Sequence, residues 1–144
     1  MNVEVRAVVI VDDRLVVHRV RKPDGEHLSL PGGRVRARES VEMALVREVL
    51  EETRLRVTPG RLLYAFEVVS RVTFEDLNLV FLAELTDAGA GGLHPADTID
   101  LSSTDQVLPP IADVIRGDLA EQWAMTPRWL GNIWDAARGR PLNP

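Results

Sequence analysis

The feature that most constrains the fold is a stretch without glycine or proline between Ser40 and Thr53. Its apolar residues recur at helical spacing, which predicts an amphipathic helix anchored to a core by one stripe. The members of that stripe are Met43, Val46, Val49 and Leu50. Ser40 is expected to cap the N-terminus of this helix, and Glu42 in the first turn suits the helix dipole.

Runs of β-branched and aromatic residues on both sides of this helix predict strands. The first two runs are separated by a short polar segment, so the chain is expected to begin with a hairpin. The expected strands cover residues 3–11, 15–20, 61–73 and 77–85, with Asp12-Asp13-Arg14 and Glu75-Asp76 as turns.

Segments rich in polar residues and glycine predict loops. Residues 21–26 are expected to form a polar loop that could cover a site, and residues 86–95 and the segment after them to be irregular. Two further helices are expected, one beginning at residues 111–116 and one over residues 127–138. Strands and helices in this order favour a mixed α+β domain, and the length favours one domain over residues 1–144.

The composition excludes several classes of function. With 45% hydrophobic and 27% charged residues, and no apolar run near the ~20 residues that span a membrane, the chain is expected to be soluble. The absence of cysteine excludes thiolate chemistry and suits the cytoplasm, as does an N-terminus unlike a signal peptide. A formal net charge of −5 would repel a nucleic-acid polymer.

Three glutamates of the predicted helix carry the strongest chemical signal. Glu48, Glu51 and Glu52 fall at i, i+3 and i+4, so their side chains are expected to converge on one patch. Such a patch is most often a solvated acidic surface. The predicted apolar stripe faces nearly the opposite direction, which points the glutamates outward into a cleft or solvent.

The residues around the glutamates form a longer pattern. Its elements are Gly33, five residues, Glu39, seven residues, Arg47-Glu48-Val49, one residue, Glu51-Glu52 and then Leu55. This pattern resembles the signature of the Nudix hydrolase family, with the lead-in Leu30-Pro31-Gly32-Gly33 that often accompanies it. Arg54 departs from the signature, which usually has glycine there. If that backbone is left-handed, the non-glycine residue costs roughly 1–2 kcal/mol.

The resemblance implies an α/β/α sandwich with a mixed sheet and a site for Mg²⁺, for which Mn²⁺ could substitute. Glu51 and Glu52 are then the main metal ligands, helped by the backbone carbonyl of Gly32. Glu48 is a ligand or the base that activates water, and the family contains both cases. By the same resemblance, Arg47 orients a catalytic glutamate.

In the family pattern Glu39 braces the loop before the helix. Gly33 is the other structural residue of the motif. The implied activity is attack of water on a diphosphate bond of a nucleoside diphosphate linked to another group, or of a nucleoside triphosphate. A small nucleotide-linked molecule is therefore the expected partner, and a homodimer is left open. The alternatives are a nucleotide-binding or regulatory module of the same fold with weak catalysis, and a structural domain with an acidic helix.

Weaker candidates have no spacing that selects among them. Arg19 and Arg21, with Lys22, lie at the end of the second predicted strand, where a Nudix-like domain would bring substrate phosphates; the alternative is a solvated basic stretch. A fourth acidic ligand often comes from a later loop in the family. The candidates are Glu75, Glu84, Asp97 and Asp105.

Histidines and aromatic residues are expected to serve the structure. His18, His27 and His94 show no metal-ligand spacing, and His27, beside the Pro-Gly-Gly segment, is the one singled out for a test. The aromatic residues are expected in the core, with base stacking as the alternative for those on strands. They are Tyr64, Phe66, Phe74, Phe81, Trp123, Trp129 and Trp134.

Overall fold

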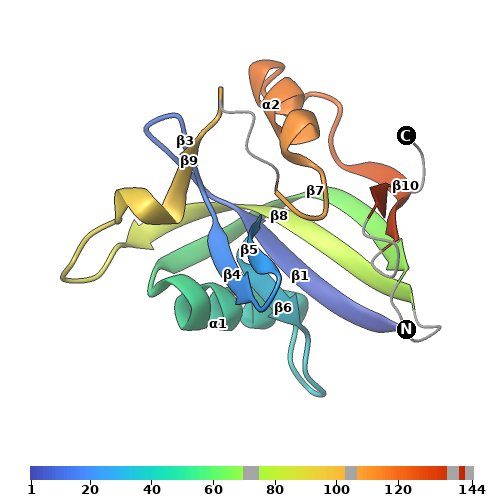
Figure 1. Cartoon of the computed structure of the whole chain (residues 1–144), viewed down its shortest axis with the longest axis horizontal. Helices are drawn as coiled ribbons and strands as arrows, with labels where there is room; N and C mark the ends of the chain where they lie inside the picture. Colours follow the sequence, from blue (N-terminus) through green and yellow to red (C-terminus); the bar gives the residue numbers. More distant parts are fainter. Residues whose placement is uncertain (70–74, 103–106, 136–139, 142–144) are drawn as a thin grey trace.

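A mixed sheet forms the centre of the protein (Figure 1). The computed structural model describes residues 1–69, 75–102, 107–135 and 140–141, and within them the strand order is β11-β10-β7-β8-β1-β6. β1 runs parallel to β8 and β10 parallel to β7, whereas the other neighbours are antiparallel. The strands are β1 (Asn2–Val8), β6 (Gly32–Arg34), β7 (Arg56–Val69), β8 (Glu75–Asp87), β10 (Arg128–Asp135) and β11 (Arg140–Pro141).

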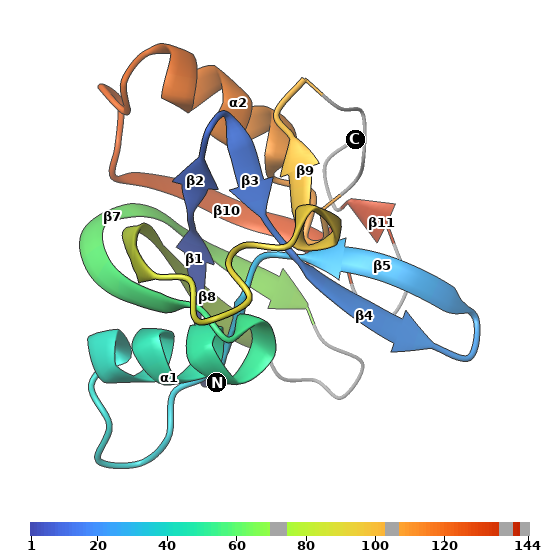
Figure 2. The ribbon, with the colours of Figure 1, turned by 90° about the vertical axis from the view of Figure 1, so that its left-hand side faces the viewer.

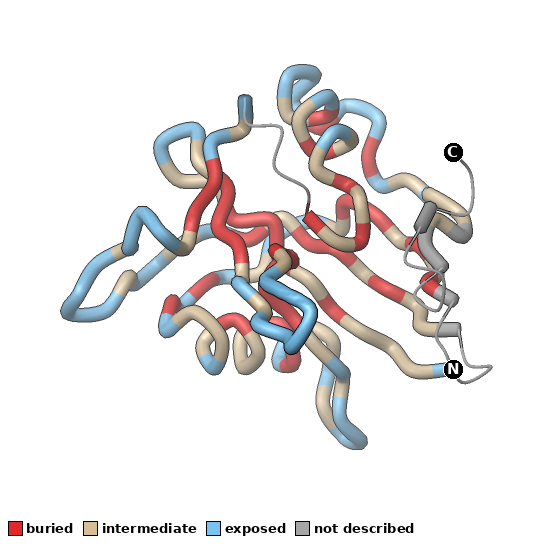
Figure 3. The backbone as a smooth tube through the Cα atoms, in the orientation of Figure 1, coloured by how far each residue is buried: buried red, intermediate tan, exposed pale blue. Residues whose placement is uncertain are grey.

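Helices α1 (Val41–Thr53) and α2 (Ala112–Ala120) lie on opposite sides of this sheet (Figure 1). The buried residues accordingly form two clusters, one with α1 and one with α2, and the buried segments lie mainly between the helices (Figure 3). The expected α/β/α sandwich with a mixed sheet is confirmed. Neither helix is long and apolar enough to cross a membrane, as judged over the described residues.

Two smaller sheets lie beside the central sheet in the part of the chain that the structure describes (Figure 2). The predicted first hairpin is confirmed, because Ile10 pairs with Leu15 around the turn at Asp12 and Asp13. The segment predicted as a loop at residues 21–26 belongs instead to a second hairpin, and the prediction of irregular structure after residue 86 is also wrong in part. The additional elements are β2 (Ile10–Val11), β3 (Arg14–Val16), β4 (His18–Lys22), β5 (Gly25–Ser29), η1 (Pro95–Asp97) and β9 (Thr98–Asp100).

The long strands β7 and β8 correct two predicted boundaries. Glu75 and Asp76 lie inside β8, paired with Val69 and Val68, so the predicted turn there is wrong. β7 begins at Arg56 because the strand continues through Pro59-Gly60, where the register with β8 shifts. Proline and glycine are uncommon within strands, but here β7 continues through both residues and is paired with β8 on either side of them.

The predicted helix over residues 127–138 is wrong where the structure describes it, because Arg128–Asp135 form β10. Apolar residues at neighbouring positions fit both a helix and an irregular strand, and parallel pairing with β7 decides between them. Gly131 has φ +76°, a value outside the helical range. Trp129 is 58% exposed and does not pack as expected, whereas Trp123 is buried as predicted.

The buried face of α1 also differs from the prediction. Ala44, Leu45 and Val49 are buried, whereas Met43 is 62% exposed, so only Val49 of the expected stripe is fully inside. The small Ala44 allows the helix to approach the sheet on the side that Glu48 and Glu52 share, since residues four apart lie on one face. These two glutamates therefore face the body of the protein rather than away from it.

Helix α1 ends at Arg54 in a left-handed conformation, with φ +63° and its N–H donating to Leu50 O at 3.0 Å. We expect Arg54→Gly to raise the free energy of unfolding by about 1 kcal/mol, because glycine adopts this conformation without strain and loses part of the gain through chain entropy. Urea denaturation measures the change. Arg54→Ala keeps the strain and is the control; an equal gain in both variants would contradict the assignment to backbone strain.

Candidate active site

The segment before α1 is fixed to strand β1 by main-chain contacts. Arg6 is the antiparallel partner of Gly32, and Ala7 N–H donates to Pro31 O at 2.8 Å. A Cβ atom on Gly32 would lie 1.9 Å from Val5 O, far inside contact distance. Glycine at this position therefore allows β6 to lie against β1.

Gly33 makes room for a side chain of α1. A Cβ atom at Gly33 would lie 2.5 Å from the Glu48 carboxylate carbon and 2.7 Å from both its oxygens. The Glu48 carboxylate thus rests directly on the Gly33 backbone, and its side chain is only 16% exposed. The second glycine of the lead-in sets the position of a candidate catalytic glutamate.

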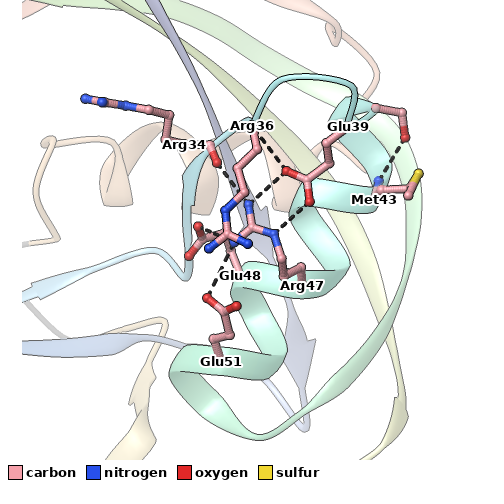
Figure 4. A network of polar contacts seen from close by, with 8 residues as sticks. Arg34, Arg36, Glu39, Met43, Arg47, Glu48 and Glu51 are labelled. Atoms are coloured by element: carbon pink, nitrogen blue, oxygen red, sulfur yellow. Dashed lines mark hydrogen bonds and ion pairs between the residues drawn. The ribbon is translucent and has the colours of Figure 1, made fainter.

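Arg47 joins the motif residues into one network (Figure 4). Its Nε and Nη2 donate to the two carboxylate oxygens of Glu39 at 2.7 and 2.8 Å, and its Nη1 donates to Glu48 Oε1 at 2.8 Å. Further contacts reach Glu51 Oε2 at 3.4 Å and Arg34 O at 3.1 Å. A guanidinium with planar donors suits this task, since it can hold one carboxylate in a bidentate pair and orient another.

Glu39 links this network to the loop before the helix. Its Oε1 also accepts from Arg36 N–H at 3.1 Å. The hydrogen bond from Arg47, followed by that from Arg36, lowers the pKa of Glu39 to about 2. The side chain thus accepts hydrogen bonds at both its oxygens from groups on two segments.

We expect acid to weaken the fold through Glu39. A pKa below its ordinary value near 4.5 means that Glu39 stabilises the folded protein above about pH 4.5, and that this contribution is lost as pH falls toward 2. The free energy of unfolding measured from pH 6 to pH 2 should therefore decline less steeply in Glu39→Gln than in the natural chain. Parallel curves for the two proteins would contradict this role.

Glu52 lies at the other side of the lead-in. Its Oε2 accepts from Gly32 N–H at 3.1 Å and lies 3.2 Å from His18 Nδ1. Burial raises the pKa of Glu52 even though the Gly32 N–H and the charges of His18 and Arg6 act in the opposite direction, and the charge of Glu48 adds to the increase. Glu48 and Glu52 therefore lie close enough for their charges to repel each other.

His18 was not identified by the sequence as a site residue. It begins β4 and pairs with Ser29, so its approach to Glu52 depends on how the β4–β5 hairpin lies beside α1. No spacing in the sequence carries that information. His27, the histidine singled out for a test, is half-buried on β5, and His94 Nδ1 accepts from Ala96 N–H beside η1.

The carboxylates fit a hard divalent cation in their chemistry, because oxygen ligands are those that Mg²⁺ prefers. Glu48 and Glu51 contact Arg47, however, and Glu52 contacts Gly32. Among the described residues, no three acidic or histidine side chains are gathered as ligands of one ion. Glu52 is half-buried, and a bound cation would offset the cost of desolvating its charged carboxylate.

The predicted phosphate ligands lie on the β4–β5 hairpin. Arg19 Nε donates to Ala96 O at 2.6 Å and its Nη1 to Glu26 at 3.0 Å, whereas Arg21 is 90% exposed. Alternation along β4 places both arginines on the side opposite His18. Their contact with phosphate stays a prediction.

The remaining candidates are scattered. Glu84 is exposed on β8, Asp97 is half-buried in η1, and Asp105 lies outside the described residues. The core assignment of Tyr64, Phe66 and Phe81 is confirmed. Phe74 and the side chains of Glu75 and Trp134 also lie outside the described part of the chain.

Comparisons with known proteins agree with this fold. The family model described as NUDIX domain matches residues 1–121. The chain belongs to the Nudix family. A Bacillus subtilis (strain 168) protein named "Putative 8-oxo-dGTP diphosphatase" is 32% identical over 102 residues, which are 71% of this chain and 64% of that protein. The chain therefore spans less than two thirds of the length of that relative.

Solved structures show the same Nudix fold. A NUDIX hydrolase from Nitrosomonas europaea superposes with a TM-score of 0.66 at 20% identity, covering 93% of this chain and 78% of the other. An ADP-ribose pyrophosphatase from Streptococcus suis superposes with a TM-score of 0.58 at 21% identity, covering 93% and 98%. At these identities the likeness concerns the fold, so substrate specificity has to be argued from the site.

Proposed function

We propose that this Nudix protein is a Mg²⁺-dependent hydrolase of a phosphoanhydride bond in a nucleoside diphosphate linked to another group, or in a nucleoside triphosphate. The observation that carries the proposal is the placement of Glu48 and Glu52 on the buried side of α1, against the Gly32-Gly33 backbone. A solvated acidic surface would not bring half-buried carboxylates onto a glycine loop.

In this proposal Glu51 and Glu52 would hold the metal, together with the carbonyl of Gly32 and, in one of its two roles, Glu48. When bound, Mg²⁺ neutralises phosphate oxygens and lowers the pKa of the attacking water. Glu48 is either one of these ligands or the base that takes the proton of that water. Its carboxylate is fixed for either role by Arg47 on one side and by the Gly33 backbone on the other.

The residues around the carboxylates supply orientation. Arg47 and Glu39 form a bidentate pair that limits rotation of the guanidinium toward Glu48, and Gly32 N–H holds one oxygen of Glu52. Such supporting contacts commonly change metal affinity or activity about 10- to 100-fold when removed. In this proposal the network therefore gives a role to Arg47 and Glu39 as well as to the three glutamates of α1.

The substrate class is argued from what the names of related proteins have in common. An 8-oxo-dGTP diphosphatase and an ADP-ribose pyrophosphatase act, by those names, on different molecules that share a nucleoside and a phosphoanhydride bond. The proposal is limited to that shared bond. The net charge of −5 also favours a small substrate bridged by a cation over a nucleic-acid polymer.

A panel assay tests this function. The protein is incubated with 8-oxo-dGTP, dGTP, ADP-ribose and a UDP-sugar in Mg²⁺, in Mn²⁺ and in EDTA, and the products are separated by chromatography. We expect a nucleoside monophosphate from at least one compound, with either metal and not with EDTA. Nucleotide binding without hydrolysis of any compound would instead support a regulatory module.

A further inference from the structure

We propose that Arg6 is a positioning residue for Glu52, because it fixes the segment leading to Gly32, whose N–H holds that carboxylate. The proposal rests on the proposed function, since it treats Glu52 as a metal ligand. It concerns a residue of β1 that lies outside the signature and carries no role in the family pattern quoted above.

The Arg6 guanidinium has acceptors on three different parts of the chain. Its Nε donates to Asn78 Oδ1 at 2.8 Å, its Nη2 to Glu4 Oε2 at 2.8 Å and its Nη1 to Leu30 O at 3.3 Å. The side chain is only 16% exposed. A planar fork that is satisfied in three directions has little freedom to rotate.

The partners of Arg6 are themselves fixed. Asn78 is 1% exposed within β8 and its Nδ2 donates to Asp76 O at 3.4 Å. Glu4 is the parallel-strand partner of Asn78, and Arg6 that of Val80. Arg6 therefore connects the centre of the sheet to the segment that enters β6.

A half-buried arginine in the middle of a sheet is costly to desolvate, and apolar residues of similar volume often stabilise such positions equally well. Packing alone gives no reason for a charge here. The contact that distinguishes Arg6 is the one to Leu30 O, because it reaches the lead-in. A positional role accounts for that contact.

The path from Arg6 to Glu52 is short. Arg6 Nη1 holds Leu30 O, Ala7 N–H holds Pro31 O at 2.8 Å, and the next residue, Gly32, donates its N–H to Glu52 Oε2. Consecutive carbonyls are thus tied to β1 immediately before the donor that contacts the glutamate. Loss of the first tie would allow the Gly32 N–H to shift relative to α1.

The experiment compares Arg6→Gln, Arg6→Lys and the natural chain. Mn²⁺ affinity is measured without nucleotide by isothermal titration calorimetry, and kcat and KM are measured separately on the substrate found in the panel assay. We expect about 10-fold weaker Mn²⁺ binding and a similar fall in kcat in both variants, with KM for nucleotide unchanged within about twofold. Lysine should not restore binding, because a point charge cannot occupy all three acceptors in one plane.

Two further variants keep the test independent of whether Arg6→Gln folds. Asn78→Leu removes an acceptor of Arg6 without touching the lead-in and should weaken Mn²⁺ binding in the same direction, whereas Asn78→Asp keeps the acceptor and should not. Arg14→Gln is the matched control. Arg14 Nε donates to Thr98 Oγ1 at 2.7 Å and ties β3 to β9. Circular dichroism checks that each variant is folded.

Several outcomes would overturn the proposal. Unchanged Mn²⁺ affinity in folded Arg6→Gln would remove the positioning role. Full recovery by Arg6→Lys would indicate that charge alone matters, and a rise in KM alone would make Arg6 a substrate contact. A natural chain that neither binds Mn²⁺ nor hydrolyses any compound would overturn the proposed function, and this inference with it, which distinguishes the two failures.

Discussion

Replacement of Glu52 by glutamine should lower turnover by more than about 100-fold, because loss of a metal ligand should exceed the 10- to 100-fold effects of supporting residues. The fold should persist. Glutamine has nearly the same shape, its amide oxygen can still accept from Gly32 N–H, and the carboxylate it replaces is one whose pKa is raised by burial. Removing that charge therefore relieves a desolvation cost while removing the ligand.

The measurement is kcat for natural and Glu52→Gln protein, together with Mn²⁺ affinity and the midpoint of urea denaturation. Glu42→Gln is the matched control, since Glu42 is an exposed glutamate in the first turn of the same helix. It should keep near-normal turnover. A folded Glu52→Gln variant with activity close to that of Glu42→Gln would remove Glu52 from the metal site.

The bounds of α1 were predictable because their causes are local. Ser40 accepts from Met43 N–H as an N-cap, the helix runs from Val41 to Thr53, and Arg54 closes it in the left-handed conformation considered from sequence. Helix caps and left-handed helix ends depend on a few neighbouring residues, so the sequence alone can predict them. The motif residues could likewise be identified from the sequence, because the signature is a pattern of residue types at fixed spacings.

The direction in which the glutamates face was not predictable in the same way. The apolar stripe predicted for α1 includes Met43, which is exposed, and shares only Val49 with the buried residues of the helix. The sheet selects the side of Ala44 and Leu45, because a small residue lets the helix backbone approach the strands. Burial of Glu48 and Glu52 follows from that choice, and it is the reason their contacts with the glycines exist.

The contacts made by His18 and Arg6 depend on topology. His18 reaches Glu52 across 34 positions and Arg6 reaches Asn78 across 72. Neither pair has a sequence spacing that a helix or hairpin would impose. The signature therefore predicts the ligands, whereas the strands that support these residues are identified only once the sheet order is known.

The second large effect should be on stability. Gly32→Ala should lower the free energy of unfolding by about 3 kcal/mol, because overpacking against rigid neighbours costs this much. The added Cβ would meet Val5 O at 1.9 Å and the Val5 carbonyl carbon at 2.8 Å. These are backbone atoms of β1, and they can yield only if β6 moves away from its paired strand.

Gly33→Ala is the informative comparison, because its Cβ would meet the end of the Glu48 side chain, which can move at lower cost than backbone. Its stability should change by less than about 1 kcal/mol, while displacement of Glu48 should lower kcat about 10- to 100-fold. Urea denaturation and kcat, measured on both variants, separate the two roles. Equal stability of the two variants would mean that β6 can move away from β1 at little cost, and would exclude the close backbone contact as the reason for glycine at residue 32.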